Sequence, residues 1–260
     1  MTSRIFATLL LIAAPAASLA QPSPQAITGF DSYVQHLESR LAQQHQSAAT
    51  FIIPEGQSNL RQGDLIIEQL TPAHQSLPGA MLHHWRGTIF VPHATAADFD
   101  RLLQNFPVYP QVFSPQVVRT KVLSQNQNQY RIQMRFRQRH VLTVVLDASY
   151  NVTFHQLDPD HRDSISRSTR IAEIASPGTP SEHSLPPNQA HGFLWRMNTY
   201  WSCEQRDGGL VIQLESVSLT RSIPFGLGWA VTPLVESIPR ESLEFTLRSV
   251  HNALSKQKGN

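Results

Sequence analysis

Three polar side chains in the last third of the sequence could carry chemistry: Arg196, Tyr200 and Glu215. An arginine can hold a carboxylate or a phosphate through a bidentate contact, and it can stabilise an oxyanion. A tyrosine or a glutamate can act as an acid or a base. Arg196 and Tyr200 share one register of a predicted strand, and Glu215 and Arg221 lie on the next strand. Because a buried charge needs a partner, we expect the two strands to pair these groups if they face the interior.

The two registers of the first of these strands, residues 192–206, support opposite interpretations. One register carries Arg196 and Tyr200 and would form a polar interior site. The other register is mainly aromatic and would leave Arg196 in solvent. Its members are Phe193, Trp195, Met197, Thr199 and Trp201. Periodicity alone does not say which register faces inward, so both interpretations stay open.

Other catalytic and metal-binding patterns are weak. The chain has 12 histidines, but none falls in a ligand spacing such as HExxH. His155, Asp158, Asp160 and His161 share a predicted turn, where solvated loop residues are the default and a metal site the alternative. There is no Gly-x-Ser-x-Gly string, and we expect Cys203 to be a buried structural thiol. We therefore predict no catalytic residue, no metal and no cofactor.

Alternation and turn signals predict mainly strands. The strand at 129–137 is the clearest, because its apolar side chains Tyr130, Ile132, Met134 and Phe136 share one face. Arginines on its other face are expected to be solvated, with anion binding as the alternative. Asp207-Gly208 predicts a tight hairpin turn, since both residues tolerate positive φ angles. The seven predicted strands span residues 83–92, 117–123, 129–137, 140–154, 163–174, 192–206 and 209–223.

Helical spacing appears at both ends of the chain. Residues 30–41 predict a helix, preceded by a disordered start that contains Pro22 and Pro24. A long helical region is expected at 226–254, and Pro239 either kinks it or starts a second helix. Its second half has one apolar face, formed by Leu243, Leu247, Val250 and Leu254. Between these ends, Thr95 can cap a short helix, and residues 50–72 predict one or two short strands.

Composition excludes several classes of protein. With 21 basic and 19 acidic residues the formal net charge is +2, so the basic footprint of a nucleic-acid-binding protein is missing. A single cysteine rules out an intramolecular disulfide framework. No later segment approaches the 18 consecutive apolar residues that predict a membrane span.

The N-terminus has the layout of a cleavable signal peptide. Arg4 precedes an apolar run from Ile5 to Ala14, and the small residues Ser18 and Ala20 follow. The run is shorter than the roughly 20 residues that cross a bilayer as a helix, so a retained anchor is the weaker alternative. We predict cleavage near Ala20 and export to a periplasmic or extracellular space.

These elements together resemble the helix-grip fold of the START and Bet v 1-like superfamily, also called the SRPBCC or polyketide cyclase/dehydrase and lipid transport group. The resemblance covers residues 81–256, after a signal peptide at 1–20 and an N-terminal extension at 21–80. Local strings are similar to secreted bacterial members with no assigned chemistry. The strings are His191-Gly-Phe-Leu-Trp-Arg-Met-Asn-Thr-Tyr-Trp201, Ser218-Leu-Thr-Arg-Ser-Ile-Pro-Phe-Gly-Leu-Gly-Trp229 and Ile238-Pro-Arg-Glu-Ser-Leu-Glu244.

The resemblance implies an α+β helix-grip fold, with a curved antiparallel sheet of about six to seven strands wrapped on a long C-terminal helix. It also implies an apolar cavity between sheet and helix that holds a lipid, a polyketide or another hydrophobic molecule. The expected ligand-binding residues are Phe90, Tyr130, Ile132, Met134, Phe136, Trp195, Arg196, Tyr200, Glu215, Trp229, Leu243 and Leu247.

Three functions follow from that expectation. The first is a non-enzymatic exported protein that binds a hydrophobic or amphipathic small molecule in the cavity. The second is an enzyme of the cyclase or hydratase type, in which Tyr200 and Glu215 act as acid or base and Arg196 stabilises an oxyanion. The third is an envelope interaction protein with a filled core, in which residues 21–80 cover the sheet or bind a partner.

Overall fold

The computed structural model describes most of the chain after residue 20. The described residues are 21–53, 60, 64–71, 76–139, 143–186, 189–190, 194–222 and 228–257. At 76, 139, 228–236 and 257 the description covers the backbone alone. The predicted signal peptide therefore lies outside the described residues.

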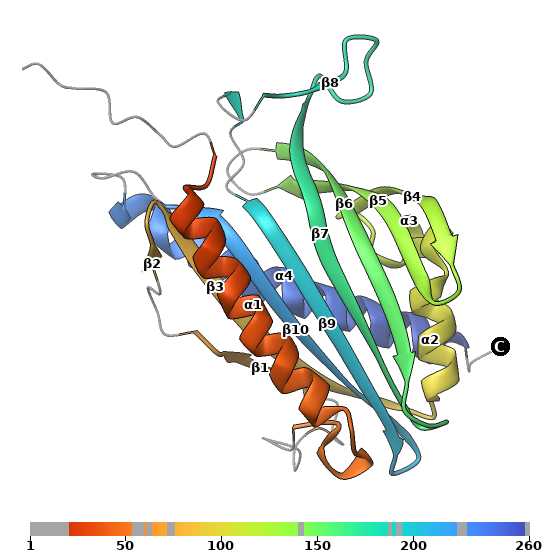
Figure 1. Ribbon diagram of the computed structural model, residues 1–260. Helices are drawn as coiled ribbons and strands as arrows, with labels where there is room; N and C mark the ends of the chain where they lie inside the picture. Colours follow the sequence, from red (N-terminus) through yellow and green to blue (C-terminus); the bar gives the residue numbers. More distant parts are fainter. Residues whose placement is uncertain are drawn as a thin grey trace, which may run out of the picture.

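One antiparallel sheet dominates the fold, with a long helix on each of its faces (Figure 1). The elements follow in the order α1 (Pro24–Gln44), η1 (Ala48–Thr50), β1 (Ile66–Gln69), β2 (Ser76–Leu77), β3 (Ala80–Pro92), α2 (Ala96–Gln104), η3 (Phe106–Val108), α3 (Tyr109–Val112), β4 (Val117–Asn126), β5 (Gln129–Arg139), β6 (Thr143–Gln156), β7 (His161–Ala175), β8 (His183–Ser184), β9 (Leu194–Arg206), β10 (Gly209–Arg221) and α4 (Gly228–Gln257).

The sheet has the strand order β1-β3-β10-β9-β7-β6-β5-β4, and the short strands β2 and β8 pair with β3 and β7. All seven predicted long strands are present. The sequence predicts β1 as a short strand but does not predict β2 or β8. Asp207 and Gly208 have φ angles of 56° and 77° and join β9 to β10, which confirms the predicted hairpin. Together the sheet and α4 form the α+β helix-grip arrangement.

Helix α4 packs across one face of the sheet, which we call the inner face. It is one helix of 30 residues with Pro239 in its interior. Leu243, Leu247, Val250 and Leu254 are all buried, as their spacing predicts. Gly87 on β3 allows the close approach, because a Cβ there would lie 2.3 Å from Leu247 Cδ1.

Helix α1 covers the opposite face, which we call the outer face. The predicted disordered start is wrong, since Ser23 caps the helix by accepting a hydrogen bond from the Ala26 amide, and Pro24 begins it. Proline suits this position because its φ angle is helical and its missing N–H would have no helical partner. The buried side of α1 consists of Ala26, Phe30, Val34, Leu37 and Leu41.

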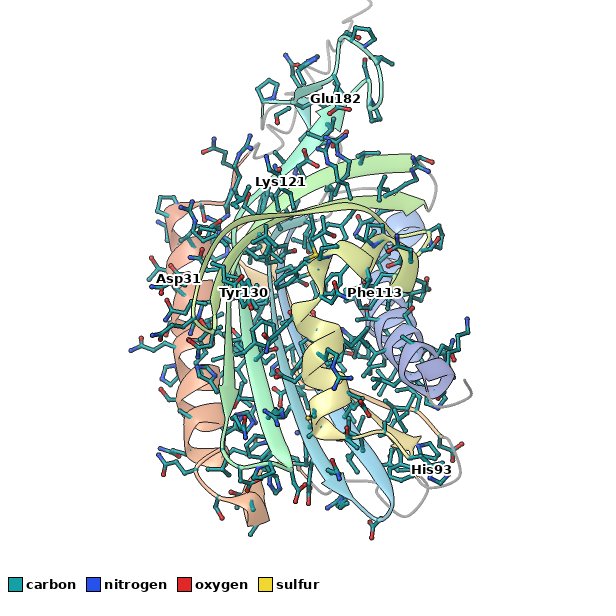
Figure 2. The ribbon with its side chains drawn as sticks, turned by 90° about the vertical axis from the view of Figure 1, so that its right-hand side faces the viewer. Asp31, His93, Phe113, Lys121, Tyr130 and Glu182 are labelled. Carbon is teal, nitrogen blue, oxygen red and sulfur yellow. The ribbon has the colours of Figure 1, made fainter. Side chains whose placement is uncertain are left out.

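The described helix and strands before residue 80 are thus built onto the sheet. The apolar side of α1 packs on Leu82 of β3 and on Val217 and Leu219 of β10. Strands β1 and β2 extend the sheet beyond β3. Figure 2 shows Asp31 of α1 on one side of the sheet and Phe113, which follows α3, on the other. Within the described part of the chain, every helix is too short or too polar to span a bilayer.

Candidate functional site

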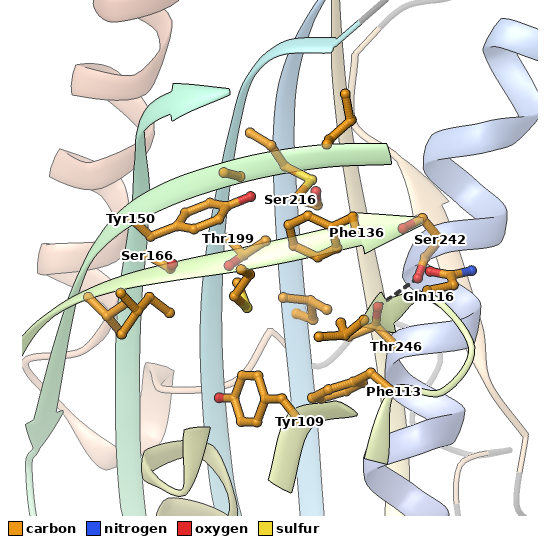
Figure 3. A pocket seen from close by; sticks show the side chains of 18 of the residues that line it. Tyr109, Phe113, Gln116, Phe136, Tyr150, Ser166, Thr199, Ser216, Ser242 and Thr246 are labelled. Carbon is orange, nitrogen blue, oxygen red and sulfur yellow. Dashed lines mark hydrogen bonds between the residues drawn. The ribbon is translucent and has the colours of Figure 1, made fainter. Parts of the chain in front are cut away.

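A cavity of about 150 Å³ lies between the inner face, α4 and the segment from α2 to α3 (Figure 3). Most of its walls are apolar. They include side chains of six strands and of α4, among them Ile132, Met134, Phe136, Met197, Trp201 and Leu243. A cavity of this size and character can enclose a small aromatic molecule.

Three hydroxyl side chains form a row across the floor of this cavity. Ser166 of β7 stands opposite Thr199 of β9, and Thr199 stands opposite Ser216 of β10. Directly opposed residues on neighbouring strands lie on one face, with Cβ atoms about 5 Å apart. The hydroxyl row, as we call these three residues, gives an apolar cavity a polar stripe.

Two tyrosines line the cavity in different ways. Tyr109 Oη donates a hydrogen bond to the Leu103 carbonyl oxygen at 2.6 Å. Tyr150 Oη is buried and has no hydrogen-bond partner among the described residues. Burial raises the pKa of both phenols well above the ordinary value of 10, so both stay protonated. Figure 3 shows the Tyr150 hydroxyl pointing into the space between sheet and helix.

Four of the predicted wall residues line the cavity, namely Ile132, Met134, Phe136 and Leu243. Two others are buried in the adjoining core, where Leu247 lies against Gly87 and the hydroxyl of Tyr130 is hydrogen bonded to Gln104 and Gln125. Trp229 belongs to α4, but its side chain lies outside the described part of the structure.

The predicted placement is wrong for Phe90 and Trp195. Phe90 pairs with Val211 on the outer face and packs on Phe51 and Ile52. Trp195 packs on the apolar cluster between α1 and the outer face. It does so because β9 shifts register between the pairs Leu219–Arg196 and Thr220–Leu194. A strand irregularity of this kind redirects a side chain, and the plain alternation of the sequence does not reveal it.

The prediction of a polar interior site is also wrong, because Arg196, Tyr200 and Glu215 belong to the outer face. Arg196 stands opposite Leu219, and Tyr200 stands opposite Glu215. Leu219 and Tyr200 both pack in the cluster against α1. The cavity floor is instead formed by the alternate register, through Met197, Thr199 and Trp201.

Glu215 is buried at the centre of a polar network under α1. Its Oε2 accepts a hydrogen bond from Arg40 and lies 2.8 Å from His84 Nε2. On the other side of the same ring, His84 Nδ1 lies 2.8 Å from Tyr33 Oη. Burial alone would raise the pKa of Glu215, but the hydrogen bond with His84 and the charge of Arg40 outweigh it and hold the pKa below 4.5. The glutamate is therefore ionised and fixes α1 to the sheet.

Tyr200 takes part in a second contact with α1. Its hydroxyl donates to Glu38 Oε1 at 3.1 Å, and Arg167 of β7 binds both oxygens of the same carboxylate at 2.6 and 2.8 Å. The hydroxyl is also 3.3 Å from Asn198 Nδ2. Tyr200 therefore acts in docking α1 and does not reach the cavity.

Of the arginines of β5, Arg131 and Arg137 are exposed, as expected, whereas Arg135 is paired within the protein. Arg135 is buried and makes two hydrogen bonds each to Asp147 and Glu182, at 2.7 to 2.9 Å. The expectation that this side chain is solvated is wrong, and the anion it binds belongs to the protein itself. Bidentate geometry of this kind favours arginine over lysine.

A serine, a histidine and an aspartate meet at the end of α1 without forming a usable triad. Ser202 Oγ lies 2.9 Å from His45 Nε2, but His45 Nδ1 is 3.8 Å from Asp163 Oδ2, beyond hydrogen-bond distance. Ser202 is 3% exposed, so a substrate could not reach it. Cys203 is buried as expected, and burial raises the pKa of its thiol to about 12.

No group of three or more His, Cys, Asp or Glu side chains within the described ranges is placed to hold a metal ion. In the predicted turn, His161 Nδ1 is hydrogen bonded to Asp158. The residues that sequence reasoning missed are Tyr109, Tyr150 and the hydroxyl row. The only sequence signal for these residues is that Ser164 and Ser166 alternate along β7. Such alternation is also common on exposed strand faces, so it does not indicate a cavity.

Comparison with known proteins gives structural likeness without sequence relatives. No family model matches the chain, and no curated protein matches it. Among solved structures, the STAR-related lipid transfer protein of Xanthomonas axonopodis is 15% identical, with 72% of this chain and 98% of that chain covered and a TM-score of 0.46. A START superfamily protein of Mycobacterium smegmatis is 11% identical, with 67% and 98% covered and a TM-score of 0.46.

The Zhui aromatase/cyclase of a Streptomyces species is similar to the same degree, at 14% identity, 68% and 95% coverage and a TM-score of 0.47. At these scores the likeness carries no argument about this chain. The helix-grip description rests on the strand order and on α4, and the site rests on the cavity between them.

Proposed function

We propose that this protein is an exported, non-enzymatic binding protein for a hydrophobic or amphipathic small molecule, of a lipid or polyketide-like kind. The ligand occupies the cavity between the inner face of the sheet and α4. The single observation that carries the proposal is the cavity itself, an apolar space of about 150 Å³ beside the buried core cluster. Well-packed interiors contain few voids larger than a water molecule.

Binding would be driven by removal of apolar ligand surface from water, at roughly 25 cal/mol per Å². Arg137, which is exposed, is the one formally charged side chain among the described residues of the lining. A ligand therefore meets apolar walls and hydroxyl groups in the interior, which suits a hydrophobic body with limited polarity.

Export belongs to the same proposal. It is supported by Arg4, the apolar run from Ile5 to Ala14 and the small residues before Gln21. Membership in a secreted bacterial group is likewise a proposal. N-terminal sequencing of the protein from the extracytoplasmic fraction of its own host should begin at Gln21. A chain that retains residues 1–20 would contradict cleavage.

Neither alternative function gains an observation of its own. The cyclase or hydratase alternative depends on Arg196, Tyr200 and Glu215, which lie on the outer face against α1. A filled core is disfavoured by the cavity. Helix α1 does cover the sheet, but on the face away from the cavity.

Native mass spectrometry tests the proposal. Protein purified from its own host should retain a hydrophobic species or take one up from a panel of fatty acids, monoacylglycerols and bicyclic aromatics. Thr199→Phe places a ring on the cavity floor and should abolish uptake, whereas Val118→Phe places the same ring at an exposed position of β4 and should not. No retained species and no uptake by the natural protein would refute the proposal.

A further inference from the structure

Tyr150 presents a buried hydroxyl to the cavity. The side chain is 2% exposed, and no described group accepts or donates a hydrogen bond at its Oη. Buried polar groups in folded proteins are nearly always paired, so an unpaired hydroxyl at a cavity wall marks a position for an external partner. The chain satisfies the neighbouring Tyr109 through Leu103, which shows that it can pair a phenol in this region.

The hydroxyl row lies on the same cavity. Ser166, Thr199 and Ser216 come from three adjacent strands and stand in one line across the floor. An interior selected only for hydrocarbon would have apolar residues at such inward positions. Together with the Tyr150 hydroxyl, this row instead suits a ligand that carries hydrogen-bonding atoms.

The charge of the lining restricts those atoms. Arg137 is exposed, and the remaining described lining residues carry no formal charge. A buried ionised group without a partner of opposite charge is strongly disfavoured. A ligand carboxylate or ammonium buried away from Arg137 would therefore lack a partner of opposite charge, whereas a neutral oxygen needs none.

We propose that the end of the ligand that enters the cavity carries a neutral hydrogen-bonding oxygen, a carbonyl or a hydroxyl, which is bound by Tyr150 together with the hydroxyl row. This inference rests on the proposed binding function. It narrows the ligand class to oxygenated hydrophobic molecules and separates them from plain hydrocarbons and from ligands with a charged buried end.

Three probes of nearly equal shape test the inference. They are 2-acetylnaphthalene, 2-isopropenylnaphthalene and 2-naphthoate, which place a carbonyl, a methylene and a carboxylate at the same position. Titration calorimetry at pH 7 should show that the acetyl compound binds most tightly and the naphthoate most weakly. Because one hydrogen bond changes affinity by several-fold to about tenfold, Tyr150→Phe should lower the ratio of acetyl to isopropenyl affinity by that factor.

Tyr109→Phe is the matched control, since it removes a phenol oxygen from the same cavity wall. It should leave the affinity ratio unchanged while lowering the thermal midpoint, because the bond to Leu103 is lost. Tyr150→Phe should leave the thermal midpoint of the free protein unchanged or raise it, because no described partner loses a bond. A lowered midpoint in Tyr150→Phe would show that the hydroxyl has a structural partner and would overturn the inference.

The outcomes distinguish a failure of the inference from a failure of the proposed binding function. Binding of the probes with an affinity ratio that Tyr150→Phe does not change overturns the inference and leaves the binding function intact. Tightest binding of 2-naphthoate also overturns the inference. Failure of all three probes to bind overturns the inference, and the proposed function is overturned with it if the fatty acids and monoacylglycerols are not taken up either.

Discussion

The two faces of the sheet use the same strands in opposite ways. On the outer face, the polar residues of β9 and β10 are paired with α1, as with Tyr200 and Glu38 or Glu215 and Arg40. On the inner face, the same strands present Thr199 and Ser216 to a cavity. A row of polar residues on a buried strand is therefore no sign of an active site by itself. A polar group without a protein partner next to open space is the better sign of a binding site.

Two histidines that are neighbours in sequence illustrate the difference. His84 faces outward and is hydrogen bonded to Glu215 and Tyr33. His83 faces the other way, where its Nε2 lies 2.9 Å from Thr220 Oγ1. Burial lowers the pKa of His83 to about 4, so the inner face holds it neutral.

The largest expected effect comes from truncating side chains on each face. Phe30→Ala removes a buried ring of α1 from the packed outer face and should reduce the free energy of unfolding by about 4 kcal/mol. Phe136→Ala widens an existing cavity from a partly buried position and should cost about 2 kcal/mol or less. Urea unfolding measures both, and equal losses would contradict the contrast between a filled face and an open one.

The second largest effect on stability is expected from the charge network under α1. Glu215→Gln should destabilise the protein by about 2 to 3 kcal/mol at pH 7, because charged hydrogen bonds to Arg40 and His84 are weakened. Glu244→Gln, which removes an exposed pair with Arg248 on α4, should change stability by about 0.5 kcal/mol or less.

The effect of Glu215 also has a defined pH dependence. Its pKa is lower in the folded protein than the ordinary 4.5, so its contribution is complete above that pH and is lost as pH falls through the folded value. The difference in stability between the natural protein and Glu215→Gln should narrow below about pH 4.5. A difference that stays constant down to pH 3 would show that this carboxylate is not ionised in the fold.

Titration of His83 should have a smaller effect on stability than titration of Glu215, and at a higher pH. Its folded pKa of about 4 lies below the ordinary 6.5, so the unfolded chain takes up a proton in this window that the folded chain does not. Stability should fall by on the order of 1 to 2 kcal/mol as pH decreases from 6.5 to 4, and His83→Gln should remove this part of the slope. An unchanged slope in the variant would place the titrating group elsewhere.

The periodicity of the sequence was sufficient to predict the long strands of the sheet and helix α4. Alternation in 129–137 and the Asp207-Gly208 turn predict β5 and the β9–β10 hairpin, and the spacing of Leu243 and Leu247 predicts the apolar face of α4. Four cavity residues followed from these patterns together with the family resemblance. The sequence did not reveal which register of β9 faces inward, because both faces of the sheet are covered. Helix α1 buries the outer face and α4 covers the inner face.

The remaining features depend on contacts between distant parts of the chain. Arg40 and Glu215 are separated by 175 residues, and Tyr33 and His84 by 51, so no local pattern pairs them. The register shift that turns Trp195 outward leaves no trace in a sequence of alternating residues. A cavity arises from how side chains fail to fill space, which neither propensity nor periodicity encodes.

The methionine methyl groups offer the most direct test of the central claim, that the inner face binds a hydrophobic ligand. The chain has four methionines, of which Met134 and Met197 line the cavity, whereas Met81 lies outside it on β3 and Met1 precedes the predicted cleavage site. Methyl NMR of protein labelled at methionine should show the signals of Met134 and Met197 shifting on addition of 2-acetylnaphthalene while that of Met81 stays in place. Unchanged signals from Met134 and Met197 at saturating probe would contradict the account.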